Sequence, residues 1–164
     1  MDITLEAGNG LFSHRVGAII IDSGCVLLAK NNDSNRYYSV GGRVMFGEST
    51  ADAVLRESLE EIKIGLEIER LAFIHENIFF WEAMQRPLHE IAFFYLMKPE
   101  RSLRETVLEP VSETYGEVSF HWIELDSLSD VDVFPEFFKT ELKNMPETVC
   151  HIITKDDLSI SRNA

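Results

Sequence analysis

Residues 51–62 repeat apolar side chains with the period of an α-helix, whereas the segments on either side have the composition of β-strands. Ser49 precedes the repeat, and Asp52 lies three residues after Ser49. This spacing predicts an N-cap at Ser49 with an acidic first turn, and Thr50 is the alternative cap. A helix with one apolar stripe needs a surface to cover it, and a sheet built from the flanking segments supplies one. The expected stripe consists of Ala51, Val54, Leu55, Ser58, Leu59 and Ile62.

The flanking segments predict a sheet of several strands. β-Branched and aromatic residues form short runs that are separated by turn residues such as Asp22-Ser23-Gly24 and the glycine turn Gly41-Gly42. A second helix is expected at 135–142, with Pro135 in its first turn. The pattern predicts an α/β (α+β) fold, an α/β/α sandwich in which helices flank a mixed β-sheet, as a single domain over 1–164. The expected strands are 15–21, 25–29, 37–40, 66–75, 78–81, 90–97 and 118–123, with an edge strand at 149–154 and a polar loop at 100–116.

Three glutamates gather on the polar face of the predicted helix. Glu57, Glu60 and Glu61 are spaced i, i+3 and i+4, so their Cβ atoms lie about 5 to 6 Å apart. Two full charges at this separation repel by about 3 kcal/mol at an effective dielectric near 20, and the helix dipole disfavours anions in the last turns. Taken alone, such a triplet is most often a solvated surface. A divalent cation reverses the balance, because Mg2+ binds carboxylate oxygens and shares substrate phosphates.

Upstream residues place these glutamates in a longer pattern. Residues 42–64 read Gly, five residues, Glu, seven residues, Arg-Glu, two residues, Glu-Glu, two residues and an aliphatic. This pattern resembles the Nudix box, the signature of the Nudix hydrolase (MutT-like) family, and the resemblance implies a Nudix-type α/β/α sandwich. The matching positions are Gly42, Glu48, Arg56, Glu57, Glu60, Glu61 and Ile64.

Three positions depart from the Nudix pattern. Ser58 stands where an aliphatic residue is usual, on the expected packing side of the helix. Lys63 replaces the glycine that normally ends the helix, where a left-handed conformation costs a non-glycine residue about 1 to 2 kcal/mol. The alternative is a helix that continues to Gly65, with Lys63 complementing the dipole. Val40 stands where many relatives have proline, and none of the three changes removes an expected metal ligand.

The resemblance implies hydrolysis of a phosphoanhydride bond with Mg2+ or Mn2+ as cofactor. The implied substrate is a nucleoside diphosphate linked to another moiety, such as ADP-ribose, a dinucleoside polyphosphate or a nucleoside triphosphate. The cation would neutralise diphosphate oxygens and acidify the attacking water. The expected metal ligands are the carboxylates of Glu57, Glu60 and Glu61 and the carbonyl of Gly41.

Arg56 and a general base complete the expected catalytic group. Arg56 is flanked by acids and is expected to fork onto Glu48 or Glu57 and to fix their rotamers. Glu57 is the first candidate for the general base because it belongs to the motif, and Glu113 and Glu117 from a later segment are the alternatives. Three further acids remain open for this role: Glu76, Glu82 and Glu90.

Residues outside the box are expected to recognise the substrate. Arg15 and Arg36 could contact a phosphate, and Tyr37, Phe79 and Trp81 could stack on a base, although aromatic residues in strand runs more often belong to the core. The five histidines have no metal-ligand spacing and are expected to be structural.

Charge and composition limit the partners. The chain has 28 acidic and 15 basic residues, a formal charge of −13, so long nucleic acid is a poor partner. A capped RNA end remains open as a substrate, although the acidic balance disfavours a long RNA. No stretch approaches the roughly 20 apolar residues of a membrane span, and the first residues lack the build of a secretion signal, so a cytoplasmic protein without a membrane partner is expected. Cys25 and Cys150 belong to no Cys-x-x-Cys motif and are expected to be reduced thiols.

Two other interpretations compete with the hydrolase. A non-catalytic Nudix-like domain that senses a nucleotide or scaffolds a partner should tolerate loss of the acidic face, yet every acid of the motif is present. A diphosphate isomerase of related fold would need proton-transfer residues that the sequence does not single out. The protein partner expected from the resemblance is a second copy, since homodimers are common among relatives; the sequence neither supports nor opposes this.

Overall fold

The computed structural model of the protein describes residues 1–98, 103–113 and 116–156, except for the side chain of Glu113. The described strands are β1 (Thr4–Ala7), β2 (Gly10–Ile19), β3 (Ile21–Asp22), β4 (Cys25–Asn31), β5 (Tyr37–Arg43), β6 (Ile68–Trp81), β7 (Arg86–Met97), β8 (Val111–Glu113), β9 (Gly116–Glu124), β10 (Val133–Phe134) and β11 (Cys150–Lys155). The helices are α1 (Thr50–Ile62) and α2 (Phe138–Glu141), with 3-10 turns η1 (Glu82–Met84), η2 (Leu103–Glu105) and η3 (Leu125–Asp130).

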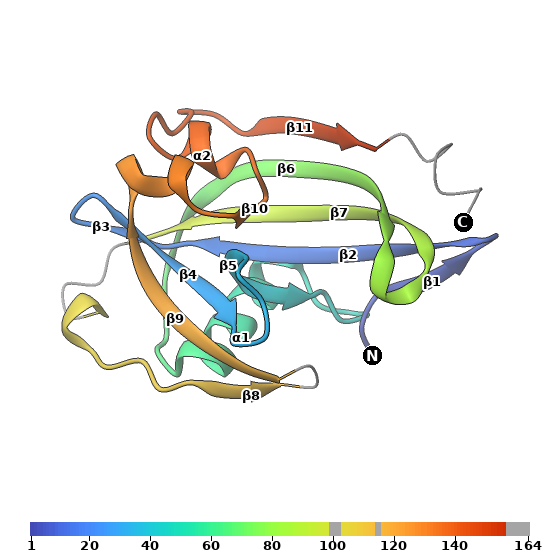
Figure 1. Ribbon diagram of the computed structural model, residues 1–164. Coiled ribbons are helices and arrows are strands. Elements are labelled where there is room, and N and C mark those ends of the chain that lie inside the picture. The colour runs from blue at the N-terminus through green and yellow to red at the C-terminus, as the bar shows by residue number, and fades with distance from the viewer. Residues whose placement is uncertain (99–102, 114–115, 157–164) are drawn as a thin grey trace.

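The strands form one mixed sheet, as the sequence predicted. Its order is β11-β6-β7-β2-β5-β4-β9-β8, with β1 on β2, β10 on β5 and β3 on β4 (Figure 1). β2 runs parallel to β7 and β11 runs parallel to β6, whereas β6 and β7, β2 and β5, and β4 and β9 are antiparallel. β5 pairs with β4 over its first residues and with β2 over its last four, so the sheet divides into two parts at this strand.

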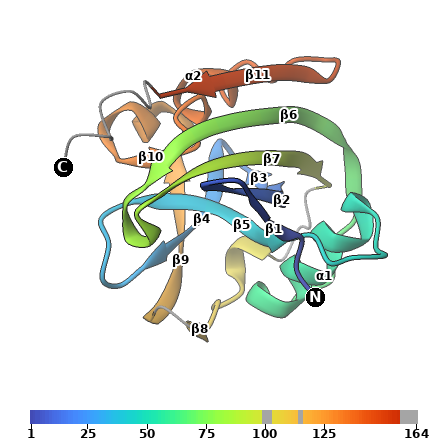
Figure 2. The ribbon, with the colours of Figure 1, turned by 90° about the vertical axis from the view of Figure 1, so that its right-hand side faces the viewer.

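Two hydrophobic clusters cover the two faces of the sheet. Alternate residues of β2 and β4 enter different clusters: Ala18 and Leu27 pack toward α1, and Ile19 and Leu28 pack toward α2. Figure 2 shows α1 below the curved sheet and α2 above it. The expected sandwich with helices on both faces of a mixed sheet is therefore confirmed.

The buried face of α1 differs from the expected stripe. Leu59 is 52% exposed, whereas Ala53 is buried and Glu61 is only 8% exposed. Ser58 lies on the packing side as expected and is fully buried. A sequence pattern defines a stripe only to within one neighbouring row of the helix, and the contacts with the sheet select the row that is buried.

Several predicted boundaries are wrong, each for a structural reason. Gly41 and Gly42 lie inside β5 rather than in a turn. Position 41 requires glycine because β2 lies so close that a Cβ there would approach the carbonyl oxygen of Val16 to 2.2 Å. The predicted strands 66–75 and 78–81 form the single strand β6, in which polar Asn77 pairs with Glu90 of β7. β1 and the N-terminal half of β7 carry too few apolar residues to be predicted.

The remaining differences concern short elements. Pro135 follows β10 and precedes the single turn of α2, so it is outside the helix that was predicted at 135–142. The predicted loop at 100–116 contains η2 and β8, while 99–102 and 114–115 lie outside the described residues. The edge strand near the end of the chain is confirmed as β11, and Cys25 and Cys150 are free thiols as expected.

Candidate active site

α1 begins and ends with defined caps. The Ser49 hydroxyl accepts a hydrogen bond from the backbone N–H of Asp52 at 3.1 Å, so Ser49 and not Thr50 is the N-cap. At the other end Lys63 adopts the left-handed conformation with φ 59°, and its N–H donates to the carbonyl of Leu59. The alternative, a helix that continues to Gly65, is therefore wrong: the helix stops where the Nudix pattern stops it, although the residue is a lysine.

The last two turns of α1 bring two carboxylates to the glycine pair of β5. The Glu57 carboxylate occupies the position that a side chain at Gly42 would need, since a Cβ there would lie 2.3 Å from the Glu57 carboxyl carbon. Glu61 accepts a hydrogen bond from the backbone N–H of Gly41 at 3.3 Å. Gly42 thus lets the helix approach the strand and makes room for the Glu57 carboxylate, whereas Gly41 lets β2 approach and holds Glu61 through its N–H; we call this arrangement the cradle.

Arg56 connects four groups around this cradle. Its Nε and Nη2 donate to the two oxygens of Glu48 at 3.1 and 2.6 Å, and its Nη1 donates to Glu57 Oε1 at 2.8 Å. Nη2 also donates to the carbonyl of Arg43 at 3.0 Å, and Nη1 reaches Glu60 at 3.4 Å. The expected fork of Arg56 onto Glu48 and Glu57 is confirmed, and it orients both carboxylates.

The surroundings shift the pKa values of Glu57 and Glu48 in opposite directions. Burial raises the pKa of Glu57, and the hydrogen bond and charge of Arg56 oppose that rise. Hydrogen bonds from Arg56 lower the pKa of Glu48, whose carboxylate is also held by the N–H of Met45 at 2.6 Å. Glu57 is therefore the carboxylate of the pair whose surroundings favour taking up a proton.

The ligand set expected from the resemblance is gathered in part. Glu57, Glu61 and the backbone of Gly41 meet at the cradle, whereas Glu60 is 59% exposed and contacts Arg56. Among the described residues no three His, Cys, Asp or Glu side chains are grouped tightly enough to form a metal site by themselves. Gly41 is engaged there through its N–H, and the two carboxylates nevertheless suit a hard cation that keeps several waters and shares ligands with a substrate.

A cavity of about 380 Å³ lies on the face of the sheet that is opposite α1. Gly41 of the cradle belongs to its lining, as do four of the residues expected to bind substrate: Arg15, Arg36, Phe79 and Trp81. Arg36 is held by both carboxylate oxygens of Asp132 at 3.1 Å. The structure thus joins Arg15 of β2, Arg36 before β5, and Phe79 and Trp81 of β6 into one pocket on the opposite face of the sheet from the acidic helix.

Two other expected site residues, Tyr37 and Glu117, are placed away from this lining. Tyr37 packs edge-on against His121 and beneath Lys30, and its neighbour Tyr38 lines the cavity instead. Glu117 is exposed and accepts a hydrogen bond from Asn32 at 2.8 Å. Glu113 ends β8, and its side chain lies outside the described residues.

Two cavity residues were missed as ligand contacts. Ser13 is two residues from Arg15 on β2, and Glu90 is an acid at the head of an apolar strand; both line the cavity and are buried. Burial raises the pKa of Glu90, while the charges of Arg15 and Arg43 oppose that rise. The available signal was the strand period, because Ser13 shares a face with Arg15, and a buried acid in an apolar run needs a partner.

Comparison with known proteins agrees with this geometry. The NUDIX domain family model matches residues 12–143. A MutT protein from Bacillus halodurans has a similar structure, with 19% identity over 88% of this chain and 92% of that one and a TM-score of 0.61. A MutT NUDIX hydrolase from Burkholderia pseudomallei is 26% identical over 70% of this chain and 84% of that one, with a TM-score of 0.53. An ADP-ribose pyrophosphatase from Streptococcus suis is 17% identical over 87% of this chain and 98% of that one, with a TM-score of 0.55. No curated protein sequence matches significantly.

Fold and site together define an α+β hydrolase. The chain belongs to the Nudix hydrolase family, whose model covers most of its length. None of the helices in the described residues combines the length and the apolar character needed to cross a membrane.

Proposed function

We propose that the protein is a Mg2+- or Mn2+-dependent pyrophosphohydrolase that cleaves a phosphoanhydride bond in a nucleoside diphosphate linked to another moiety. The observation that carries this proposal is the cradle, in which Glu57 lies against Gly42 and Glu61 bonds Gly41, a residue that also lines the cavity of about 380 Å³. Structures of similar fold include proteins named ADP-ribose pyrophosphatase and UDP-X diphosphatase, which act on substrates of this kind.

The cradle supplies the ligands for the cation. Glu57, Glu61 and the Gly41 carbonyl would hold it, and Glu60, which contacts Arg56, would lie at the outer side. A divalent cation at this place would neutralise diphosphate charge and lower the pKa of the attacking water. Arg15 lines the same cavity and would bind substrate phosphate oxygens.

Glu57 is the proposed general base. Arg56 bonds Oε1 of its carboxylate, so Oε2 would accept the proton of the attacking water. Arg56 acts by holding Glu57 and Glu48 in place, since its guanidinium is committed to these partners and to the Arg43 carbonyl. Glu113 and Glu117 are the competing bases from β8 and β9.

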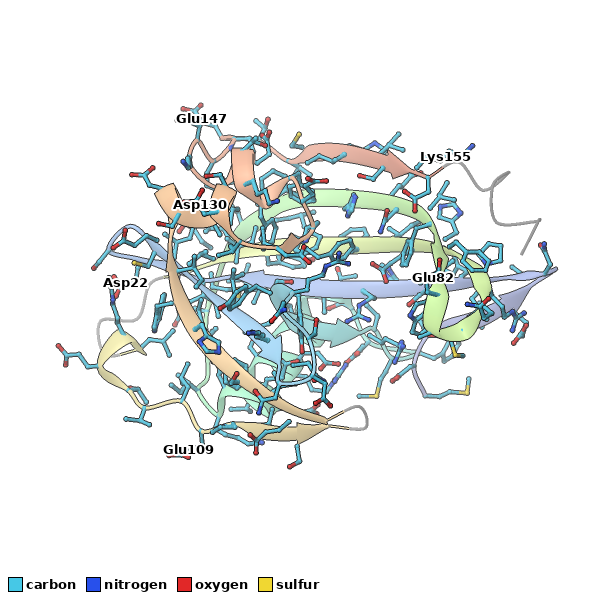
Figure 3. All side chains as sticks on the ribbon, in the orientation of Figure 1. Asp22, Glu82, Glu109, Asp130, Glu147 and Lys155 are labelled. Carbon is cyan, nitrogen blue, oxygen red and sulfur yellow. The ribbon has the colours of Figure 1, made fainter. Side chains whose placement is uncertain are left out.

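The proposed setting is a cytoplasm-like compartment with a small-molecule substrate. The free thiols Cys25 and Cys150 support a reducing environment. Acidic side chains such as Asp22, Glu109, Asp130 and Glu147 point outward (Figure 3), and the formal charge of −13 disfavours long nucleic acid.

The test is hydrolysis of a panel of nucleotide sugars, dinucleoside polyphosphates and triphosphates with Mg2+ or Mn2+, with products identified by mass in 18O water. We expect Glu57→Gln to lower kcat by about 10² to 10⁴-fold and Glu61→Gln to raise the metal concentration needed for half activity. Glu60→Gln should have a smaller effect, because that side chain is mostly exposed.

Matched variants decide between the bases and the competing function. Glu69→Gln, at an exposed position of β6, is the control and should keep wild-type rates. A larger loss in Glu113→Gln or Glu117→Gln than in Glu57→Gln would move the base to the β8–β9 region. If the protein binds nucleotide but forms no metal-dependent product from any substrate, the hydrolase proposal is wrong and the nucleotide-sensing domain takes its place.

A further inference from the structure

One half of the sheet face that carries α1 has no helix over it. Val16 of β2 and Tyr95 of β7 belong to the hydrophobic cluster beneath α1, whereas Phe12 and Ile91, four residues earlier on the same face of these strands, do not. Figure 1 shows β2, β6 and β7 continuing well beyond α1. We call this uncovered half the open face. Its apolar residues are Leu5 of β1, Phe12 of β2, Ile91 of β7, Ile74 and Ile78 of β6, and Ile153 of β11.

Strand pairing makes the open face one continuous surface. His14 of β2 lies opposite Ile91 of β7, Ile91 lies opposite Glu76 of β6, and Glu76 lies opposite Ile153 of β11. Leu5 extends this surface onto β1, which pairs with β2. Residues directly opposite one another in a sheet project to the same face, so five strands contribute to this surface.

The apolar residues of the open face are accessible. Ile153 and Leu5 are 62% and 53% exposed, and Ile74, Ile78 and Ile91 are half-buried. None of these five residues belongs to either hydrophobic cluster. With strands about 4.8 Å apart and a rise of about 3.3 Å per residue, the open face covers about 500 Å². Apolar patches of this size on soluble proteins commonly mark an interaction site.

Charge decides which partner suits the open face. The chain has a formal charge of −13, so two copies repel each other unless they meet where acids are few. Among the described positions of the open face Glu76 is the only acid, and its Oε1 lies 2.9 Å from His151 Nε2. The same negative charge disfavours an anionic lipid surface as the partner. A second copy brings an equally acid-poor apolar surface.

The step between α1 and the open face also fits a second copy. A helix is about 10 Å thick, which is about the distance between two stacked sheets. A partner sheet laid on the open face would therefore lie level with α1. If a two-fold axis runs across the strands, the strands of the two copies are antiparallel and each α1 lies beyond the end of the partner's open face.

We propose that the open face binds a second copy of this chain, sheet against sheet, in a two-fold symmetric dimer. The inference is independent of the proposed function, because the cavity lies on the opposite face of the same strands. Two copies would bury about 1,000 Å² in total, which is near the lower limit for a specific interface. The dimer is therefore expected to dissociate on dilution.

Sedimentation velocity of the full chain over a series of protein concentrations tests the proposal. The wild-type protein should pass from monomer to dimer as the concentration rises. Ile91→Lys puts a positive charge at the centre of the open face of both copies and should raise the dissociation constant of the dimer by about 10-fold or more. Ile153→Lys should act in the same direction, and this change is compatible with folding because the side chain is 62% exposed.

Val107→Lys is the matched control. It adds the same charge at an apolar residue that is 79% exposed and lies outside the open face. This variant should dimerise with the dissociation constant of the wild-type protein. Thermal unfolding of all three variants shows that the comparison is made between folded proteins.

Each of three results would overturn the proposal. The first is a wild-type protein that stays monomeric at every concentration. The second is a dimer that neither Ile91→Lys nor Ile153→Lys weakens, which would place the interface elsewhere. The third is an equal loss in Val107→Lys, which would assign the effect to net charge. A protein that dimerises through the open face but hydrolyses no nucleotide would refute the proposed function and leave the dimer in place.

Discussion

At the scale of single residues, Arg56 changes the meaning of the acidic face. Repulsion among Glu57, Glu60 and Glu61 suggested that only a cation could make the cluster tolerable, but the Arg56 guanidinium lies among Glu48, Glu57 and Glu60 and supplies positive charge without a metal. At the glycine pair, Glu61 bonds the Gly41 N–H and Glu57 bonds Arg56, so these two carboxylates are the ones that a cation would bind.

Gly42→Ala tests the cradle at this scale. The new Cβ would lie 2.3 to 2.5 Å from the Glu57 carboxyl group, so that side chain must move away from its position. Because displacement of a catalytic group by about 1 Å can cost about 100-fold, we expect kcat to fall by about that factor while the protein remains folded.

The control for this change is Gly65→Ala, where a Cβ would meet nothing within 4 Å. Steady-state kinetics and thermal unfolding should show wild-type values for that variant. Normal activity in Gly42→Ala would show that the position of the Glu57 carboxylate is not needed for turnover.

At the scale of elements, α1 is defined by its two ends. Ser49 satisfies an otherwise free backbone N–H at the start, which is the sequence signal for a helix N-terminus. The end at Lys63 has no such signal, because a left-handed lysine is unfavourable by itself. Contacts of the last turn, such as buried Ile62, outweigh that local cost.

Lys63→Gly should be more stable than Lys63→Ala. Glycine adopts φ 59° without the Cβ penalty, so we expect the free energy of unfolding to rise by about 1 kcal/mol relative to Lys63→Ala, measured by urea denaturation. The alanine variant is the proper reference because it also loses the bond from Lys63 Nζ to the Glu60 carbonyl. Equal stability of the two variants would mean that the left-handed conformation carries no strain here.

At the scale of the whole molecule, the two faces of the sheet have different tasks. The face toward α1 is packed with apolar residues and holds the acidic helix in place, whereas the opposite face combines a second apolar cluster with buried polar residues. His75 belongs to the second face, where its Nε2 pairs with Thr154 of the edge strand at 2.9 Å. Burial lowers the pKa of His75 from 6.5 to about 4.

This shift predicts that global stability falls in acid. Between pH 6.5 and about 4 the unfolded chain binds a proton at His75 that the folded chain does not, so the stabilisation present above pH 6.5 is lost as the pH falls. From pH 7 to pH 5 the free energy of unfolding should fall by about 2 kcal/mol on this account. Urea denaturation of His75→Gln should show a correspondingly weaker pH dependence.

His89→Gln changes an exposed histidine and is the control for this measurement. It should retain the pH dependence of the wild-type protein. An unchanged pH dependence in His75→Gln would assign the acid sensitivity to other groups.

Much of the fold and part of the candidate site could be predicted from local pattern. Local features of the sequence include the strand runs, the α1 cap and the spacing of Glu48, Arg56, Glu57 and Glu61. They are predictable because the backbone geometry of a strand or helix fixes which nearby residues share a face. The fork of Arg56 followed from the same reasoning.

Other features depended on contacts between distant segments. Gly41 and Gly42 continue β5 because β2 and α1 approach them, and Tyr38 rather than Tyr37 lines the cavity because β5 turns that face toward the pocket. Ser13 and Glu90 meet only through the parallel register of β2 and β7. Local sequence encodes which residues can share an element, but the pairing of elements far apart in the chain determines which side chains meet.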